Sequence, residues 1–322
     1  MVMLSKKIQS PFRRLQFKAL YVAITLCFPI LTAQTISAQQ EAMYSQYMFN
    51  MLHVNPAYAG DRAVDNVNLM YRKQWVNIDG APVTASLSWD RRQENSNIGY
   101  GLQIINDKLG IENSLMIKGF YSYRLPFESS ALALGINAGV LNYQAKFSEV
   151  ITHTGGDPSF MENVNKFMPS VGVGALFSSD VFYIGLSVPD LLETKFSVNN
   201  EVVELSPNIH YFLTTGAVFG VTEGFKLKPS VMLKAVEGAP LEFDYNLNAW
   251  FNDVIGVGAS FRPGNAVVGM FELQVSNSFR LGYAYDYSIS NLNKYTKGTH
   301  EIMLRYEFSK SKYKRVYSPR YY

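Results

Sequence analysis

Apolar and polar side chains alternate one by one in short segments from about residue 67 to residue 308, and this alternation limits the fold more than any other feature. Residues 83–90 show the pattern clearly. One set of alternate positions holds Val83, Ala85, Leu87 and Trp89, and the other holds Thr84, Ser86, Ser88 and Asp90. Successive side chains of a β-strand point to opposite sides, so the pattern predicts strands with one apolar and one polar face.

About fourteen such segments can be placed, most of them about 9 to 13 residues long, which suits strands that cross a bilayer at a tilt. They lie near residues 67–75, 83–91, 98–107, 113–125, 131–143, 168–178, 181–188, 207–220, 225–236, 240–251, 254–262, 265–275, 278–288 and 299–308. Lipid cannot satisfy backbone or charged groups, so membrane-spanning strands must close into a barrel with the apolar face outward. A soluble β-sandwich also alternates, but its strands are usually shorter.

These segments predict an all-β fold, a transmembrane antiparallel β-barrel of about 14 strands (about 12 to 16), with a short non-barrel N-terminal segment. Tyr and Phe number 21 each and Gly 23, as expected for many strands joined by turns. After residue 38, no stretch approaches the roughly 18 consecutive apolar residues of a membrane-spanning helix. A helical membrane protein is therefore excluded.

The first 38 residues have the order of a secretory signal peptide: a basic region without acidic residues, an apolar run from Ala19 to Leu31, and small residues ending at Ala38. We expect cleavage near Ala38, with a retained anchor as the alternative. The only cysteine, Cys27, lies in this segment. The mature chain would therefore have neither a disulfide nor a cysteine-ligated metal site.

Four parts follow from these patterns: a signal peptide over 1–38, an N-terminal periplasmic or plug segment over 39–65, the outer-membrane barrel over 66–308, and a basic tail over 309–322. The segment 39–65 either seals the periplasmic end of the barrel, plugs the lumen or docks a periplasmic partner. The tail holds five Lys and Arg and no acid, and it is either a solvated end or a contact for acidic partners. Residues 39–308 hold 19 basic against 26 acidic residues, so nothing favours nucleic acid as a partner.

One hairpin predicts its own register. If the turn is formed by residues 237–239, Lys234 lies opposite Glu242 on the polar face, as an opposite-charge pair in the lumen. A slip by one residue would turn both charges toward lipid, at a cost of about 2 to 4 kcal/mol for a basic group at the bilayer midplane.

Two long connections interrupt the strands, at about residues 144–167 and 189–206. The first contains Gly155, Gly156, Asp157 and Pro158, which break any strand. With both termini in the periplasm, connections after odd-numbered strands lie outside the cell, and both long connections fall into this group. We interpret the first as an extracellular loop, with a constriction loop folded into the lumen as the alternative.

The sequence shows no arrangement typical of catalysis or of metal binding. The four histidines, His53, His153, His210 and His300, are isolated from one another and from carboxylate clusters. No phosphate-binding glycine loop or Gly-x-Ser-x-Gly elbow occurs. We therefore expect no cofactor, no metal site and no enzyme activity. A barrel hydrolase with Ser and His on neighbouring strands is the less favoured alternative.

Several short motifs occur in order along nearly the whole mature chain and resemble the PorP/SprF family of type IX secretion outer-membrane proteins. They are SQYMFN at 45–50, VNPAYAG at 54–60, YRKQW at 71–75, GAPVT at 80–84, GLSVPD at 185–190, LGYAYD at 281–286 and GTHEIML at 298–304. The resemblance implies a non-enzymatic component that supports secretion or surface attachment of specific exported proteins, such as adhesins, and gliding motility. It implies a location in the outer membrane of a Gram-negative bacterium.

The partners implied are outer-membrane lipid, type IX secretion components and a cognate exported surface protein, with a periplasmic peptidoglycan-linked protein as a further candidate. The family motifs suggest partner-binding residues Gln46, Tyr47, Asn50, Asn55, Pro56, Gly60, Arg72, Gln74, Trp75 and Pro82. The alternative function is a channel or transporter for small or hydrophobic solutes, because fourteen strands and an N-terminal plug would serve that role too.

Overall fold

The computed structural model describes residues 44–62, 64–149, 163–192, 196–198, 201–203, 209–237 and 239–308. All of them belong to one compact unit, residues 35–322. The predicted signal peptide, the basic tail and the Gly-Gly-Asp-Pro sequence at 155–158 lie outside the described residues.

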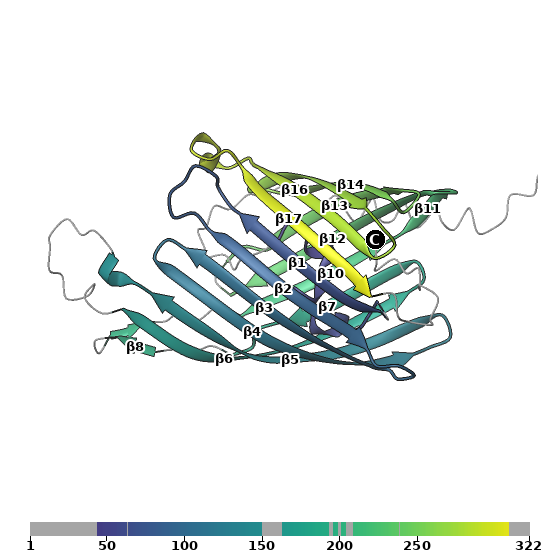
Figure 1. The fold of residues 1–322 in the computed structure, drawn as a ribbon, viewed down its shortest axis with the longest axis horizontal. Helices are drawn as coiled ribbons and strands as arrows, with labels where there is room; N and C mark the ends of the chain where they lie inside the picture. The colour runs from purple at the N-terminus through teal and green to yellow at the C-terminus, as the bar shows by residue number, and fades with distance from the viewer. Residues whose placement is uncertain are drawn as a thin grey trace, which may run out of the picture. The chain divides into compact units, whose positions relative to one another are not determined.

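Fourteen strands in the described part of the chain close into an antiparallel barrel, as the alternation predicts (Figure 1). Their order round the wall is β1 to β7, then β10, then β12 to β17, and β17 pairs with β1. The ring strands are β1 (Asp65–Lys73), β2 (Val83–Arg92), β3 (Ile98–Leu109), β4 (Glu112–Pro126), β5 (Ser130–Ala145), β6 (Val164–Ser179), β7 (Phe182–Val188), β10 (His210–Ala217), β12 (Phe225–Val236), β13 (Glu242–Phe251), β14 (Ile255–Arg262), β15 (Ala266–Gln274), β16 (Phe279–Ser288) and β17 (Thr299–Phe308).

The remaining elements are short. β11 (Phe219–Thr222) continues β10 after a break at Val218 and pairs with the same neighbour, β12. A separate hairpin, β8 (Phe196–Val198) and β9 (Glu201–Val203), lies in the connection between β7 and β10. Short 3-10 helices are η1 (Tyr47–Phe49), η2 (Met51–His53), η3 (Pro56–Tyr58), η4 (Phe147–Glu149) and η6 (Asn291–Lys294). Among the described residues, no helix is long and apolar enough to cross a membrane.

The two faces of the strands lie as predicted. On β2, Thr84, Ser86, Ser88 and Asp90 are buried inside the barrel, whereas Leu87 on the other face is 44% exposed. On β16, Ala284 and Asp286 point inward, and Tyr283 and Tyr287 point outward. The outer wall therefore presents an apolar surface to lipid, and the inner wall carries most of the polar strand residues.

The predicted hairpin register is confirmed, because Lys234 pairs with Glu242 across β12 and β13. Three details differ from the prediction. β6 begins at Val164, four residues before the expected start, because its ladder with β5 continues to the pair Ala145 and Val164. The predicted strand 207–220 is broken at Val218, and the hairpin β8–β9 was not expected in the second long connection.

The barrel has two distinct ends. Asp65 and Phe308 pair with each other, so the first and last ring strands begin and finish at one end, which we call the terminal end. Short turns join the strands there. The strand ends joined by residues 74–82, 146–163, 189–209 and 289–298 all lie at the opposite end, the loop end. Both long connections thus start and finish at one end, as the strand count predicts.

Candidate functional site: the N-terminal segment in the lumen

Residues 44–61, which we call the plug, lie inside the barrel and are almost completely buried. In Figure 1 this purple segment lies within the ring of strands. Its local structure is three successive 3-10 turns. Asn55 caps the third turn by accepting a hydrogen bond from the Ala57 N–H at 2.9 Å, and Pro56 follows it at the first helical position, where no N–H is needed.

Apolar side chains of the plug pack against apolar side chains that point inward from the wall. A single buried cluster joins plug residues such as Met48 and Phe49 to wall residues on strands all round the ring: Met70, Leu176, Phe212, Met232, Trp250, Met270 and Met303. The sequence patterns predicted a polar inner face, so these wall residues are exceptions to it. They give the plug the same kind of packed contact that side chains make in a protein core.

The plug's N-terminal end is held by charged groups near the loop end. Glu301 on β17 accepts the main-chain N–H groups of Ser45 at 2.7 Å and Gln46 at 2.8 Å. Arg72 on β1 donates to the Ser45 hydroxyl at 2.8 Å and forms ion pairs with Glu301 at 3.0 Å and Asp286 at 2.8 Å. Each of these three charged side chains is 6% exposed or less, so the pairs are weakly screened by water.

A second arginine extends this anchor. Arg262 on β14 pairs with Asp244 at 2.7 Å and Asp286 at 3.5 Å, and it also donates to the Ser45 hydroxyl at 3.2 Å. The anchor therefore contains two guanidinium groups and three carboxylates from five strands, all centred on Ser45. Removing one member would leave buried charges without their partners.

The middle of the plug is fixed through its main chain. Asn68 donates to the Phe49 carbonyl at 3.2 Å, and Arg305 donates to the same oxygen. Ser187 on β7 donates to the Val54 carbonyl at 2.8 Å. Wall side chains thus satisfy plug carbonyls that have no secondary-structure partner, which a buried segment requires.

The plug ends near the terminal end of the barrel. The Gly60 N–H donates to Asp90 at 3.0 Å, and Arg92 donates to the carbonyls of Gly60 and Asp61. Arg124 forms an ion pair with the Asp61 carboxylate. Because Ser45 lies toward the loop end and Gly60 toward the terminal end, the plug runs along the lumen rather than across one mouth.

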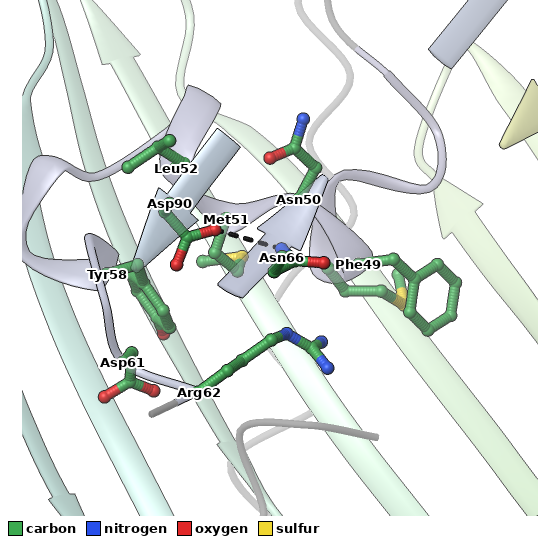
Figure 2. A pocket seen from close by; sticks show the side chains of 10 residues that line it. Phe49, Asn50, Met51, Leu52, Tyr58, Asp61, Arg62, Asn66 and Asp90 are labelled. Atoms are coloured by element: carbon green, nitrogen blue, oxygen red, sulfur yellow. Dashed lines mark hydrogen bonds between the residues drawn. The ribbon is translucent and has the colours of Figure 1, made fainter. Parts of the chain in front are cut away.

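A pocket lies between this end of the plug and strands β1 and β2 (Figure 2). Plug residues between Met48 and Asp61, together with Arg62, line it on one side. Asn66 and Asp90 line it on the other and are joined by a hydrogen bond of 2.9 Å. No group of His, Cys, Asp or Glu that could hold a metal ion occurs in the described part of the chain.

Glycines in the wall make room for the plug backbone. A Cβ atom at Gly99 would overlap the Ala59 carbonyl, one at Gly135 would overlap Ala57, and one at Gly174 would overlap the Asn55 side chain. These glycines come from β3, β5 and β6. The inner surface of the barrel is therefore shaped to the plug.

Plug side chains are also buried with hydrogen-bond partners. The Tyr47 hydroxyl accepts a hydrogen bond from Asn246 on β13 at 2.7 Å. Burial raises the pKa of the Tyr47 phenol well above its usual range, so this group stays neutral at physiological pH.

The site residues expected from the family motifs fall into two places. Seven lie in the plug or its anchor and are buried: Gln46, Tyr47, Asn50, Asn55, Pro56, Gly60 and Arg72. The other three, Gln74, Trp75 and Pro82, lie in the β1–β2 connection at the loop end, where the Gln74 N–H donates to the Pro82 carbonyl at 2.9 Å. Their partner-binding role stays a prediction. The seven could reach a partner only if the plug moved or the partner entered the lumen.

Lys234 and Glu242 form an ion pair with a distance of 3.5 Å, at the rim of the loop end. The Lys234 side chain is 4% exposed and that of Glu242 is 43% exposed, so Lys234 is buried in the lumen while Glu242 contacts solvent.

The main anchor residues Asp244, Arg262, Asp286 and Glu301 were not among the residues proposed from the sequence. The sequence did contain a signal for them. Asp286 and Glu301 lie in the family motifs, and all four are charged residues in membrane-spanning strands, where a charged side chain is expected to face the interior and to have a partner.

A second segment also enters the lumen at the loop end. After β7 the chain turns inward, and Lys118 pairs with Asp190 at 2.7 Å and donates to the Pro189 carbonyl at 3.3 Å. Asn137 donates to the same carbonyl, and Ser170 donates to Asp190. Gly172 leaves the space that Pro189 occupies.

Solved structures similar to this chain include outer-membrane proteins with low sequence identity. Omp33 of Acinetobacter baumannii is 9% identical, covers 77% of this chain and 100% of its own, and has a TM-score of 0.46. The toluene transporter TbuX of Ralstonia pickettii is 9% identical, with 79% and 91% covered and a TM-score of 0.48. The CymD monoaromatic hydrocarbon channel is 12% identical, with 83% and 93% covered and a TM-score of 0.47.

The family is identified from the sequence. No curated protein matches it. The model of the family described as type IX secretion system membrane protein PorP/SprF matches residues 36–306, which include the plug and nearly the whole barrel. The chain belongs to the PorP/SprF family of type IX secretion system membrane proteins.

Proposed function

We propose that this protein is a non-enzymatic outer-membrane component of the type IX secretion system that supports the export or surface attachment of specific proteins. It does so by binding the exported protein or the periplasmic machinery. The barrel fold and the family support a location in the outer membrane. We include cleavage of the signal peptide near Ala38 and a role in gliding motility as parts of the same proposal.

The observation that carries the proposal, beyond the family, is that the plug occupies the lumen and is bonded to the wall along its length. The charged anchor holds Ser45, wall side chains hold the Phe49 and Val54 carbonyls, and Arg92 holds Gly60. A solute channel would require this segment to leave a packed apolar cluster and a buried charge network. A barrel whose lumen holds a packed and bonded segment suits a protein that acts through its rims.

Deleting the gene in its native host and measuring all surface-exposed proteins by quantitative mass spectrometry tests this proposal. We expect one or a few exported proteins to fall at least tenfold at the surface and to return when the full chain is supplied. Barrel insertion of unrelated outer-membrane proteins serves as the control. An unchanged set of exported surface proteins, together with impaired uptake of a small solute, would favour the channel alternative and contradict the proposal.

A further inference from the structure

The lipid-facing side of the barrel wall carries very few charged side chains. Every residue of the fourteen ring strands is described, and only four Lys, Arg, Asp or Glu side chains point outward: Asp65, Lys73, Arg91 and Lys108. All four lie on the consecutive strands β1, β2 and β3. A charged side chain on the lipid face is costly unless it lies near the membrane surface or has a partner.

The two charges at the terminal end neutralise each other, and the two at the loop end do not. Arg91 pairs with Asp65 at 3.2 Å. Lys73 and Lys108 lie at the other end of the same strands, and both side chains are exposed. No ion pair joins either lysine to a described residue, including Asp79, the only acid of the β1–β2 connection. The outer wall therefore has two unpaired cations, both at the loop end.

These two lysines are neighbours across β2. Lys73 lies opposite Val83 in the β1–β2 ladder, and Val83 lies opposite Lys108 in the β2–β3 ladder (Figure 1). Since adjacent strands are about 4.8 Å apart, the two lysine backbones are about 10 Å apart with one small apolar side chain between them. The next residues in this row, His300 and Asn113, are not acidic. Lysine side chains are long and flexible, so both ammonium groups can reach one anionic group.

Both lysines lie at the border of the apolar band. On β1, the outward residues before Lys73 are Leu69 and Tyr71, which are 44% and 46% exposed. On β3, the last apolar outward residue is Ile104, and Lys108 follows after one polar outward position. A lysine at such a border extends its ammonium group away from the hydrocarbon and into the headgroup layer.

Tyrosines on β16 mark the same layer. The Tyr285 hydroxyl donates to the Lys297 carbonyl at 3.0 Å, and the Tyr287 hydroxyl accepts from Asn293 at 2.8 Å. Tyrosine is enriched where a barrel wall passes from hydrocarbon to headgroups, because its ring is apolar and its hydroxyl needs a partner. Lys294 and Lys297 in this connection are also exposed, which adds positive charge to the rim.

We propose that Lys73 and Lys108 together bind a phosphate group of lipid A, the phosphorylated part of lipopolysaccharide. Outward residues at the border of a membrane-spanning wall contact lipid, and phosphate is the anionic group of the headgroup layer, to which a lysine binds as a point charge. The strand count places the loop end outside the cell, so the leaflet at this end is the one that contains lipopolysaccharide.

This lipid site goes beyond the proposed export role and depends only on the outer-membrane location and on the direction of the loop end. Lys73 directly precedes Gln74, and Val83 directly follows Pro82. A lipid bound between the two lysines therefore lies beside the β1–β2 connection, which contains three of the predicted partner-binding residues.

Native mass spectrometry of the purified full chain, titrated with purified lipid A, tests the proposal. We expect Lys73→Gln and Lys108→Gln each to weaken lipid A binding about fivefold, which corresponds to about 1 kcal/mol, and the double variant to weaken it about 20-fold. Arg91→Gln is the matched control, because it removes an outward cation at the terminal end, and it should change the affinity less than twofold. An affinity of the double variant within twofold of wild type, or an equal loss with Arg91→Gln, would overturn the proposal.

Two further lipids identify the group that is bound. Lipid A from which the phosphates have been removed keeps the acyl chains, and we expect it to bind the wild-type chain as weakly as intact lipid A binds the double variant. Equal binding of the two forms by the wild-type chain would contradict phosphate recognition. Phosphatidylglycerol offers a phosphate from a phospholipid. If it bound more tightly than lipid A and with the same dependence on the two lysines, the assignment to lipid A would be wrong.

Cysteine labelling in intact cells checks the leaflet. The only natural cysteine, Cys27, lies in the predicted signal peptide. Tyr295→Cys places a thiol at a loop-end position that is 72% exposed in the native chain, and Glu128→Cys places one in an exposed turn at the terminal end. We expect a membrane-impermeant maleimide to label the first variant in intact cells and the second only after permeabilisation. The opposite result would place the two lysines in the inner leaflet and overturn the lipopolysaccharide site. Heat-modifiable gel mobility confirms that all variants form barrels.

Discussion

Arg72 and Glu301 lie directly opposite each other on the paired strands β1 and β17, and their side chains form an ion pair at 3.0 Å inside the barrel. The same carboxylate accepts the N–H groups of Ser45 and Gln46. Glu301 therefore contacts both the neighbouring strand that closes the ring and the main chain of the plug.

Replacing Glu301 with alanine should weaken the contact between β1 and β17 and the attachment of the plug. The variant leaves Arg72 with Asp286 as its remaining anionic partner and leaves two buried plug N–H groups without an acceptor. Breaking a buried pair by removing one partner costs about 3 to 5 kcal/mol. We expect a clear fall in the temperature at which folded barrel is lost on heat-modifiable gels. Glu128→Ala, in the exposed β4–β5 turn, is the control and should leave that temperature unchanged. Equal temperatures for the two variants would show that the anchor contributes little.

The fit between the glycines and the plug predicts a difference between two Gly→Ala variants. At Gly135, a Cβ would overlap Ala57 of the plug, whereas at Gly269 on β15 no atom lies within 4 Å. Overpacking typically costs about 1 to 3 kcal/mol, so Gly135→Ala should destabilise the barrel or expose the plug to protease. Gly269→Ala should be neutral or slightly stabilising, because alanine restricts the unfolded chain more than glycine does. Limited proteolysis with mapping of cuts in residues 44–61 should show more cleavage in Gly135→Ala than in Gly269→Ala. Equal cleavage of the two variants would contradict the predicted fit between Gly135 and the plug.

Two lysine ion pairs on the inner wall should differ in strength. Lys118 and Asp190 have side chains 5% and 11% exposed and meet at 2.7 Å, whereas Glu242 in the Lys234 pair is 43% exposed and the distance is 3.5 Å. Exposed pairs contribute about 0 to 1 kcal/mol, and losing one member of a buried pair costs several times more. Asp190→Ala should therefore lower the thermal midpoint of the barrel distinctly more than Glu242→Ala. The reverse order would contradict the burial-based ranking.

The strands could be predicted from the sequence because their faces meet different surroundings. On β2, Leu87 faces lipid and Ser88 faces the lumen, and this contrast appears as period two along the chain. The ring itself followed, since lipid forbids an open sheet edge at membrane depth. The Lys234–Glu242 register followed from the charges on a single hairpin.

The contents of the lumen could not be predicted in the same way. The contact between Ser45 and Glu301 joins residues 256 positions apart, and no local pattern specifies which inward residue a distant segment will meet. The sequence contained one sign of a segment inside the barrel. Met70, Met232 and Met303 are apolar residues at positions that the alternation assigns to the polar face, and all three belong to the buried cluster that contains the plug residues. An apolar patch on the inner face of a barrel indicates something for it to pack against.

Ion conductance of the purified full chain in planar lipid bilayers shows whether the plug, held against the wall, closes the lumen. We expect no stable conductance steps from the wild-type protein, and steps from a variant in which Arg72→Ala and Glu301→Ala together release the anchor. A general porin reconstituted in the same bilayers confirms that open channels would be detected. Regular, porin-like steps from the wild-type chain would show that the plug leaves the lumen open.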